Sequence, residues 1–275
     1  MPASVRPEIL ERVAAVAARL DRHGWGEANG GNLSLQIGPR DLLEPFVPGE
    51  ILAPGGEPQD AAGGAAIVAG GGWPGADRYL LVTATGSRMH EVAEFPAGGL
   101  CLLGREEGRL VASAGSRTPT SELPTHLALH AALPPGGAVV HSHCDHLIAL
   151  SHLPSLRGEG ALEAALLPLM PETALFLKGI AALPFVMPGG GELGAATAAA
   201  LPRADVMVWA CHGALAVGPD LETALDRLEL AEKAARIWWL IRACGEEPAG
   251  IPADCVERLR RLRDGAAGPE GGGAP

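Results

Sequence analysis

Two long amphipathic segments near opposite ends of the chain constrain its fold more than any other sequence feature. From Asp220 to Cys244, apolar side chains recur at helical spacing along one stripe. Residues 7–23 repeat this pattern, with Pro7 near the start and Gly24 placed to end a helix. Short apolar runs of β type lie between the two segments, so the sequence predicts a mixed α/β fold and disfavours an all-β barrel.

The remaining elements follow from local patterns. Residues 121–132 are expected to form a helix capped by Ser121 with Pro124 in its first turn, and further helices are expected from about Asp145 and over 192–201. Residues 38–77, rich in glycine and proline, read as a long excursion that is partly loop. We expect one domain over residues 1–265 and a disordered tail over 266–275. The expected strands are 33–37, 79–83, 100–103, 109–112, 138–143, 173–176, 182–185 and 205–211.

Composition excludes several classes of protein. The 275-residue chain carries a net charge of −11 and has no basic stripe, which disfavours a nucleic-acid partner. No apolar run is long enough to span a membrane, and the N-terminus lacks a signal-peptide pattern. The 5 cysteines are scattered without a C-x-x-C pair, which indicates a reducing compartment. We therefore expect a soluble, cytoplasmic protein.

Three histidines stand where strands are expected to end. His141 and His143 are two residues apart on one strand, so both imidazoles lie on the same face. His212 follows the apolar run 205–211. Three protein ligands with one open position are the pattern of a catalytic zinc site. Each histidine is also compatible with a plain polar residue leaving a strand, and imidazole suits several other metals.

Other residues offer rival ligands. The thiols of Cys144 and Cys211 adjoin the histidines, but adjacent strand residues face opposite sides of a sheet. His126 and His130 form a His-x-x-x-His pair on the helix after Ser121, where a buried supporting role is favoured.

Two turns and one carboxylate complete the candidate site. Asn29-Gly-Gly-Asn32 and Thr85-Gly-Ser87 are rich in small donors, which suits an uncharged anion site in an acidic protein. Glu122, at the start of a helix, either stabilises the helix dipole or acts in catalysis.

The lysines favour a metal ion over a Schiff base as the electron-accepting group of the candidate site. A reaction that leaves electrons beside a carbonyl needs either a lysine iminium or a metal ion to accept them. Lys233 lies on the exposed side of a predicted helix, and Lys178 precedes a glycine in a predicted turn. Neither setting would lower the pKa of a lysine.

With these motifs in this order, the chain resembles the class II aldolase/adducin superfamily over about residues 10–245. Within it, the resemblance is closest to the aldolases that cleave L-rhamnulose 1-phosphate. The segments that carry it are Gly24–Ser34, Val82–Ser87, Thr120–His126, Val140–His143, Pro171–Ala174, His212–Gly213 and Pro219–Ala234.

The resemblance implies a three-layer α/β/α sandwich on a mixed, largely antiparallel sheet, assembled as a homotetramer with active sites between subunits. It implies metal-dependent cleavage of L-rhamnulose 1-phosphate to dihydroxyacetone phosphate and L-lactaldehyde, with one Zn²⁺ per subunit. Glu122 falls on the catalytic glutamate of the family and Glu172 on a second one that reaches a neighbouring site. His141, His143 and His212 would bind the zinc. The phosphate would be surrounded by Asn29, Gly31, Asn32, Thr85, Gly86, Ser87 and Ser121, with the contact made by Thr85 or Ser87 left open.

Alternatives within and outside the family remain open. L-fuculose-phosphate aldolase and pentulose-phosphate 4-epimerase share the motifs, but the only tyrosine, Tyr79, leaves no C-terminal tyrosine of the kind that the fuculose enzyme uses. A cupin-like oxygenase also uses His-x-His, and the long helices argue against it. A non-catalytic adducin-like binding module would be expected to lack the histidine triad.

Overall fold

The computed structural model describes residues 5–51 and 77–265, and its strands form one nine-stranded sheet in the order β2-β5-β4-β3-β1-β6-β9-β8-β7. Among the described strands, β7 and β8 run parallel and the other neighbours are antiparallel, which confirms the predicted fold class. The strands are β1 (Asn32–Ile37), β2 (Pro48–Ile51), β3 (Tyr79–Thr83), β4 (Leu100–Glu106), β5 (Arg109–Ser113), β6 (Ala138–Ser142), β7 (Ile180–Leu183), β8 (Val206–Trp209) and β9 (Gly213–Gly218).

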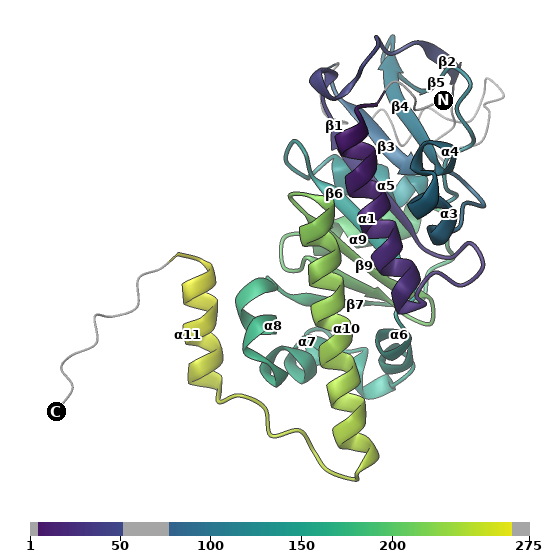
Figure 1. The fold of residues 1–275 in the computed structure, drawn as a ribbon. Coiled ribbons are helices and arrows are strands. Elements are labelled where there is room, and N and C mark those ends of the chain that lie inside the picture. Colours follow the sequence, from purple (N-terminus) through teal and green to yellow (C-terminus); the bar gives the residue numbers. More distant parts are fainter. Residues whose placement is uncertain (1–4, 52–76, 266–275) are drawn as a thin grey trace.

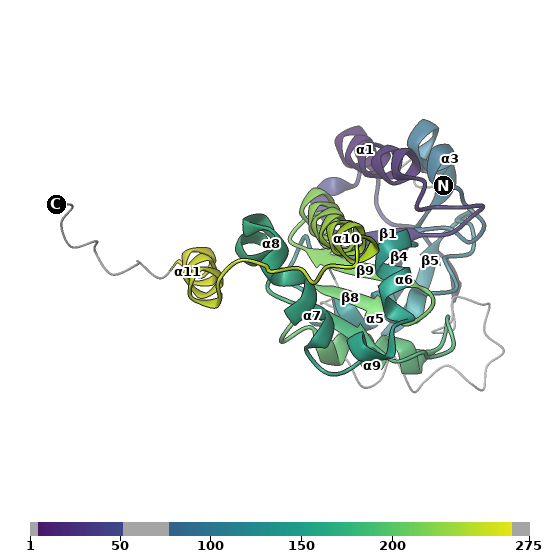
Figure 2. The same cartoon turned by 90° about the horizontal axis from the view of Figure 1, so that it is seen from below.

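Helices cover both faces of this sheet (Figures 1 and 2). In Figure 2, α1, α3 and α10 lie on one side of the strands and α9 on the other. The first layer includes α1 (Pro7–His23), α3 (Met89–Glu94), α4 (Pro96–Gly99), α6 (Asp145–Ser151), α7 (Ala161–Leu166), α8 (Pro171–Phe176) and α10 (Leu221–Ala243). The second contains α5 (Leu123–His130) and α9 (Gly191–Ala200), which pack against each other, and α11 (Ala253–Arg263) packs on α8.

Three apolar clusters of described residues hold the layers together. The largest lies between the sheet and the helices α1 and α10, and includes the buried stripe of Leu221, Leu225 and Leu228. A second lies beneath α5 and α9 around Met207 and Trp209, and a third lies between the strands β3, β4 and β5 and the start of α5. The Asp220 carboxylate caps α10 by accepting a hydrogen bond from Thr223 N (2.7 Å). The two amphipathic segments therefore form helices that each bury one face.

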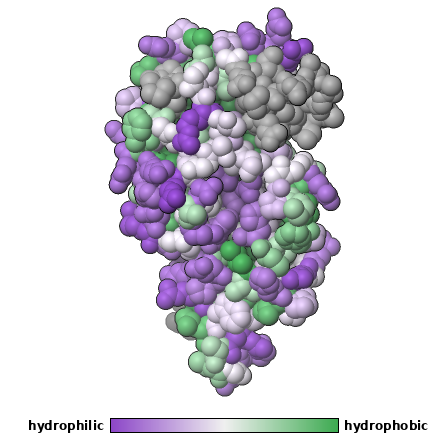
Figure 3. All heavy atoms as spheres, turned by 90° about the vertical axis from the view of Figure 1, so that its right-hand side faces the viewer, coloured by the Kyte–Doolittle hydropathy of each residue, from purple (hydrophilic) through white to green (hydrophobic). Residues whose placement is uncertain are grey.

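The outer surface is mixed in hydropathy. On the face turned toward the viewer in Figure 3, hydrophilic and hydrophobic residues are interspersed. Among the described helices, none is both long and apolar enough to cross a bilayer.

Three local predictions were wrong. Residues 173–176 belong to the helix α8, because Pro171 supplies a helical φ angle in its first turn and the Thr173 hydroxyl donates back to Met170 O. The strand expected at 182–185 lies at 180–183 and ends where Pro184, which has no N–H, cannot continue the ladder. Ser121 does not cap α5, since that helix begins later, with Glu122 at its N-cap.

Other predictions fall partly beyond the described residues. Most of the expected excursion at 38–77 and the expected tail at 266–275 lie outside them. Within the described part of the excursion, residues 39–41 form a short 3₁₀ turn and β2 joins the sheet edge.

The sheet brings distant segments together at one end of its central strands. Because β1 runs antiparallel to both β3 and β6, its first residue lies beside the last residues of those strands. The start of β9 pairs with the end of β6 in the same way. The β8–β9 connection, which holds His212, therefore lies next to His141 and Asn32.

Candidate metal and anion site

The three predicted histidines converge at this end of the sheet. His141 is the penultimate residue of β6, His143 follows that strand, and His212 lies between β8 and β9. One ring nitrogen from each lies within 4.8 Å of the others, a spacing that can hold a metal ion. The sequence-predicted triad is thus assembled in space.

Hydrogen bonds turn two of these rings toward a common point. His141 Nδ1 donates to Ala214 O (2.9 Å), and His143 Nδ1 donates to the Glu27 carboxylate (2.6 Å). A ring that donates through Nδ1 keeps its lone pair on Nε2, which is how metal-binding histidines are commonly oriented. His141 Nε2 is buried and has no hydrogen-bond partner in the described structure. This orphaned acceptor fits a bound cation.

Close packing fixes the imidazoles further. The Trp209 ring lies 4.5 Å from the ring centre of His141 and 5.0 Å from that of His212. A Cβ atom at Gly30 would come within 2.9 Å of the His143 ring, and one at Gly213 within 2.8 Å of the His141 ring. Glycine is required at both positions because the rings occupy the space of a side chain.

Glu122 completes the cluster. Its side chain is 8% exposed, with Oε2 3.4 Å from His141 Nε2 and Oε1 3.3 Å from His212 Nε2. Burial disfavours the charged carboxylate, but the neighbouring imidazoles of His141 and His212 and the amide of Asn32 outweigh that cost and lower its pKa. Burial lowers the pKa of His141 to about 4, so this ring is neutral at pH 7. Converging lone pairs beside an ionised carboxylate create a site that favours a cation.

A polar pocket of about 350 Å³ opens beside the triad. Thr85 and Gly86 are exposed on its wall, whereas the Ser87 hydroxyl is buried, donates to Gly99 O (3.1 Å) and accepts from Arg117 Nη1 (3.0 Å). The other residues predicted for the phosphate site, Asn29, Gly31, Asn32 and Ser121, also line the pocket. The pocket is lined by Glu27, Ala28, Asn29, Gly30, Gly31, Asn32, Thr83, Ala84, Thr85, Gly86, Ser87, Thr120, Ser121, Glu122, His141, His143 and His212.

Several residues considered from the sequence lie elsewhere. Glu172 is exposed on α8 and does not line this pocket. Lys178 and Lys233 are exposed and also outside it, as expected from the sequence. His126 and His130 are fully buried behind the pocket and outside the triad.

The rival thiols do not join the triad either. Cys144 is buried in the main core, where burial raises the pKa of its thiol, and Cys211 is exposed with a φ angle of +60°. The triad therefore consists of imidazoles alone among the described residues.

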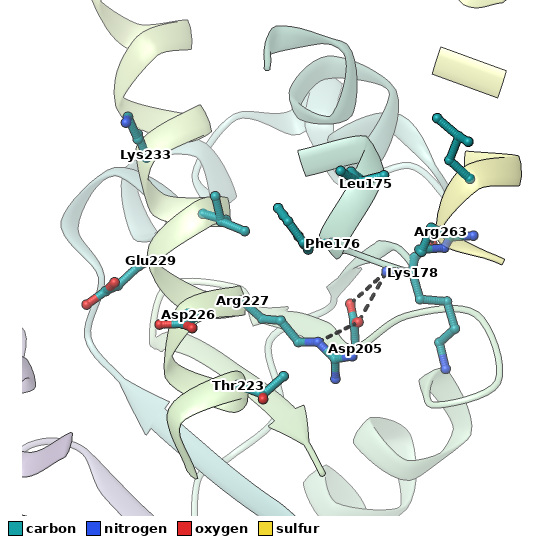
Figure 4. A pocket seen from close by; sticks show the side chains of 12 residues that line it. Leu175, Phe176, Lys178, Asp205, Thr223, Asp226, Arg227, Glu229, Lys233 and Arg263 are labelled. Carbon is teal, nitrogen blue, oxygen red and sulfur yellow. Dashed lines mark hydrogen bonds and ion pairs between the residues drawn. The ribbon is translucent and has the colours of Figure 1, made fainter. Parts of the chain in front are cut away.

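A larger pocket, of about 930 Å³, lies between α8, α10 and α11 (Figure 4). Its charged groups largely pair with their neighbours: the Asp205 carboxylate accepts from the backbone N–H of Lys178 and lies 3.1 Å from Arg227 Nε. It contains none of the histidines, so the smaller pocket is the better candidate for chemistry.

Sequence reasoning missed two residues of this region. Glu27 orients His143, and Arg117 braces the turn by donating to Thr85 O (3.0 Å) and to the Ser87 hydroxyl. Glu27 was recognisable as a carboxylate two residues before the Asn29 turn, whereas nothing near Arg117 in the sequence points to residues 85–87.

Comparison with known proteins places the chain in a family. Residues 11–239 match the model of the class II aldolase and adducin N-terminal domain. The rhamnulose-1-phosphate aldolase of Bacteroides thetaiotaomicron is 29% identical over 260 residues, covering 91% of this chain and 92% of that protein. The rhamnulose-1-phosphate aldolase of Enterococcus faecalis is 29% identical over 246 residues, covering 86% and 84% respectively.

Solved structures agree. A sugar-phosphate aldolase from Thermotoga maritima superposes with a TM-score of 0.72 at 33% identity, covering 88% of this chain and 98% of that one. An L-fuculose-1-phosphate aldolase from Thermus thermophilus shares the fold at 21% identity with a TM-score of 0.55, covering 89% of this chain and 100% of that one. The chain belongs to the class II aldolase and adducin family.

Proposed function

We propose that this protein is a metal-dependent aldolase that cleaves L-rhamnulose 1-phosphate to dihydroxyacetone phosphate and L-lactaldehyde. The observation that carries the proposal is the convergence of three histidine nitrogens and the Glu122 carboxylate beside a donor-rich pocket. The rhamnulose-1-phosphate aldolase relatives, similar over about nine-tenths of this chain, support the choice of substrate.

The histidines would hold Zn²⁺. His141, His143 and His212 supply three imidazole ligands and leave an open position, the pattern of catalytic zinc. A zinc ion held there would act as a Lewis acid on the substrate carbonyl and accept electron density as the C3–C4 bond breaks. The hydrogen bonds to Ala214 and Glu27 keep two of the rings in the tautomer that this role needs.

The phosphate would lie in the pocket against Asn29, Gly31, Asn32, Thr85, Gly86 and Ser121. Between the two residues of the 85–87 turn that the sequence left open, Thr85 is favoured, because the Ser87 hydroxyl already donates and accepts within the protein. Ser87 then supports the turn. The guanidinium of Arg117 lies behind this turn and supplies local positive charge to the phosphate site, although the protein as a whole is acidic.

Glu122 would transfer the proton at C3. In cleavage, the ionised Glu122 would take the proton of the C4 hydroxyl as the C3–C4 bond breaks, and the carboxylic acid so formed would deliver that proton to C3 of the departing dihydroxyacetone phosphate. In the reverse direction the ionised carboxylate removes that proton. The hydrogen bond from Asn32 Nδ2 (2.9 Å) holds one carboxylate oxygen in place for this exchange.

Glu172 would act in the site of a neighbouring subunit of a homotetramer. It lies on α8, outside the pocket of its own chain. On the same helix Phe176 is 55% exposed, and Leu262 of α11, which lines the same larger pocket, is 60% exposed. Large apolar side chains left in water are typical of surfaces that another subunit covers.

The rival substrate L-fuculose 1-phosphate is less favoured. Tyr79, the only tyrosine, lies on β3 with its ring 5.1 Å from that of Phe46, and it is absent from the pocket lining. It therefore cannot supply a hydroxyl at the described site.

A substrate panel tests the proposal. Purified protein supplemented with zinc is offered L-rhamnulose 1-phosphate, L-fuculose 1-phosphate and L-ribulose 5-phosphate, and dihydroxyacetone phosphate and epimerised pentulose are measured. We expect cleavage of the rhamnulose ester at the highest kcat/KM. A higher kcat/KM for the fuculose ester, or epimerisation without cleavage, would contradict the assignment.

A further inference from the structure

A buried row of polar side chains leads from Glu122 away from the pocket, between β1 and α5. Asn32 Nδ2 donates to Glu122 Oε2 (2.9 Å), and Asn32 Oδ1 lies 2.5 Å from His126 Nε2. The Ser34 hydroxyl lies 2.6 Å from His126 Nδ1 and 2.7 Å from His130 Nε2. Every member of this Glu122–His130 row is buried. Burying so many polar groups is costly unless their pairing is specific.

The row forms because the spacing between its residues along β1 is similar to their spacing along α5. Two residues along a strand cover about 6.6 Å, and four residues along an α-helix cover about 6 Å. Asn32 and Ser34 on β1 therefore lie beside the N-cap of α5 and its next two turns, which carry Glu122, His126 and His130. Beyond the row, the Gln36 amide donates to His130 O (2.9 Å) and continues the same register.

The direction of every hydrogen bond in the row is determined. An ionised carboxylate only accepts, so Asn32 presents its NH₂ group to Glu122 and its carbonyl oxygen to His126. His126 must then carry its proton on Nε2 and accept from Ser34 through Nδ1. Ser34 in turn accepts from Nε2 of His130. His130 Nδ1 is buried and has no partner in the described structure, which is where the row ends.

Both imidazoles are neutral in this arrangement. Burial lowers the pKa of His126 to about 4 and that of His130 well below its usual value. A neutral ring carries a single N–H, so the tautomer of each histidine defines what it can donate.

We infer that His126 is a positioning residue for the proton transfer: through its Nε2–H it fixes the Asn32 amide, which in turn holds the Glu122 carboxylate. The inference rests on the proposed role of Glu122. Without the His126 proton, the Asn32 oxygen is left without its buried donor, and the amide is held only by the Glu122 carboxylate 2.9 Å away, so amide and carboxylate can shift together. His126 does not line the pocket, so it acts only through Asn32.

Nitrogen NMR of the histidine rings tests the hydrogen-bond directions independently of any activity. Full-length protein labelled with ¹⁵N in its histidines, at pH 7, should show His126 and His130 with a proton on Nε2 and a bare Nδ1. Assignment comes from the loss of one ring signal in His126→Gln and of the other in His130→Gln. A proton on Nδ1 of His126, or a doubly protonated ring, would overturn the inference whatever the protein's substrate.

Kinetics then test the consequence for catalysis. His126→Phe keeps an aromatic ring, though a somewhat larger one, and removes both nitrogens, so kcat should fall by up to about a hundredfold, the scale of a small misplacement of a reacting group. Zinc content should be unchanged, and kcat should fall by a larger factor than KM rises. His126→Gln, whose amide can still donate to Asn32 Oδ1, should recover most of the loss.

Gln36→Met is the matched control, since it removes a buried side-chain hydrogen bond beyond the end of the row. It should lower the melting temperature without lowering kcat. An equal kcat loss in Gln36→Met, or a full kcat in His126→Phe, would refute the positioning role. If the wild-type protein cleaves no sugar phosphate, the proposed function fails instead, and the ring spectra still decide the directions within the row.

Discussion

Replacing Glu27 tests whether the histidines form a metal site. The Glu27 carboxylate accepts a hydrogen bond from His143 Nδ1 (2.6 Å) and thereby leaves the Nε2 lone pair of His143 facing the triad. Removing such a supporting partner typically weakens metal binding about 10- to 100-fold. Because the Glu27 side chain is 66% exposed, water competes for its role, and the lower end of that range applies.

We therefore expect Glu27→Ala to bind Zn²⁺ about tenfold more weakly, a loss of about 1.4 kcal/mol. Glu27→Gln keeps an acceptor for the His143 N–H but loses the charge, so its affinity should lie between wild type and Glu27→Ala. Competition with a fluorescent chelator at fixed pH measures each affinity.

The control is Glu11→Gln, which removes the charge of an exposed carboxylate on α1. Its zinc affinity should equal that of wild type. Wild-type affinity in Glu27→Ala, together with loss of zinc in His143→Ala, would refute the orienting role of Glu27. Wild-type affinity in both variants would refute the metal site itself.

Four further predictions concern the proton transfer, the phosphate site, the stability of the fold and the shared active site. Glu122→Gln should lower turnover by about two to four orders of magnitude and slow solvent exchange of the C3 proton of dihydroxyacetone phosphate, with zinc content unchanged. Thr85→Val should raise KM for the phosphorylated ketose with little change in melting temperature. Burial opposes the ionisation of Glu229, but hydrogen bonds from Arg19 and His23 outweigh this cost and lower its pKa. Glu229→Gln should therefore be less stable than wild type above about pH 4.3, and the difference should vanish as pH falls through the lowered pKa. Thermal unfolding of both proteins across this pH range measures the difference. Mixing inactive His212→Ala and Glu172→Ala chains should restore part of the activity, and no recovery despite proven subunit exchange would contradict a shared site.

The elements that sequence reasoning located best are those with strong periodicity. The helix predicted at 7–23 is α1, and the strand predicted at 79–83 is β3, because amphipathic repeats and β-type runs encode burial directly. The segment 173–176 failed because four residues carry too little periodicity to outweigh the helical start at Pro171. The helix α11 was not predicted; it has no fully buried residue, and its apolar residues Val256 and Leu259 are only half-buried.

The triad could be predicted because each histidine stands at the end of an apolar run, and strand ends meet at one edge of a sheet. The side chains that support the triad and its pocket could not be predicted. Arg117 reaches the 85–87 turn because the segment after β5 pairs with the end of β3, through the bridge between Ala84 and Pro119. Ser34 joins His126 to His130 only because α5 packs beside β1. Such contacts depend on tertiary register, which a single sequence does not reveal.

The most direct test of the central claim is the rate of dihydroxyacetone phosphate release from L-rhamnulose 1-phosphate, measured against bound metal. Protein stripped with a chelator should be inactive, and the rate should rise in proportion to added Zn²⁺ until about one ion is bound per chain. His143→Ala should bind little zinc and stay inactive. Full cleavage by metal-free protein, or by His143→Ala without zinc, would contradict a reaction that depends on a metal held by His141, His143 and His212.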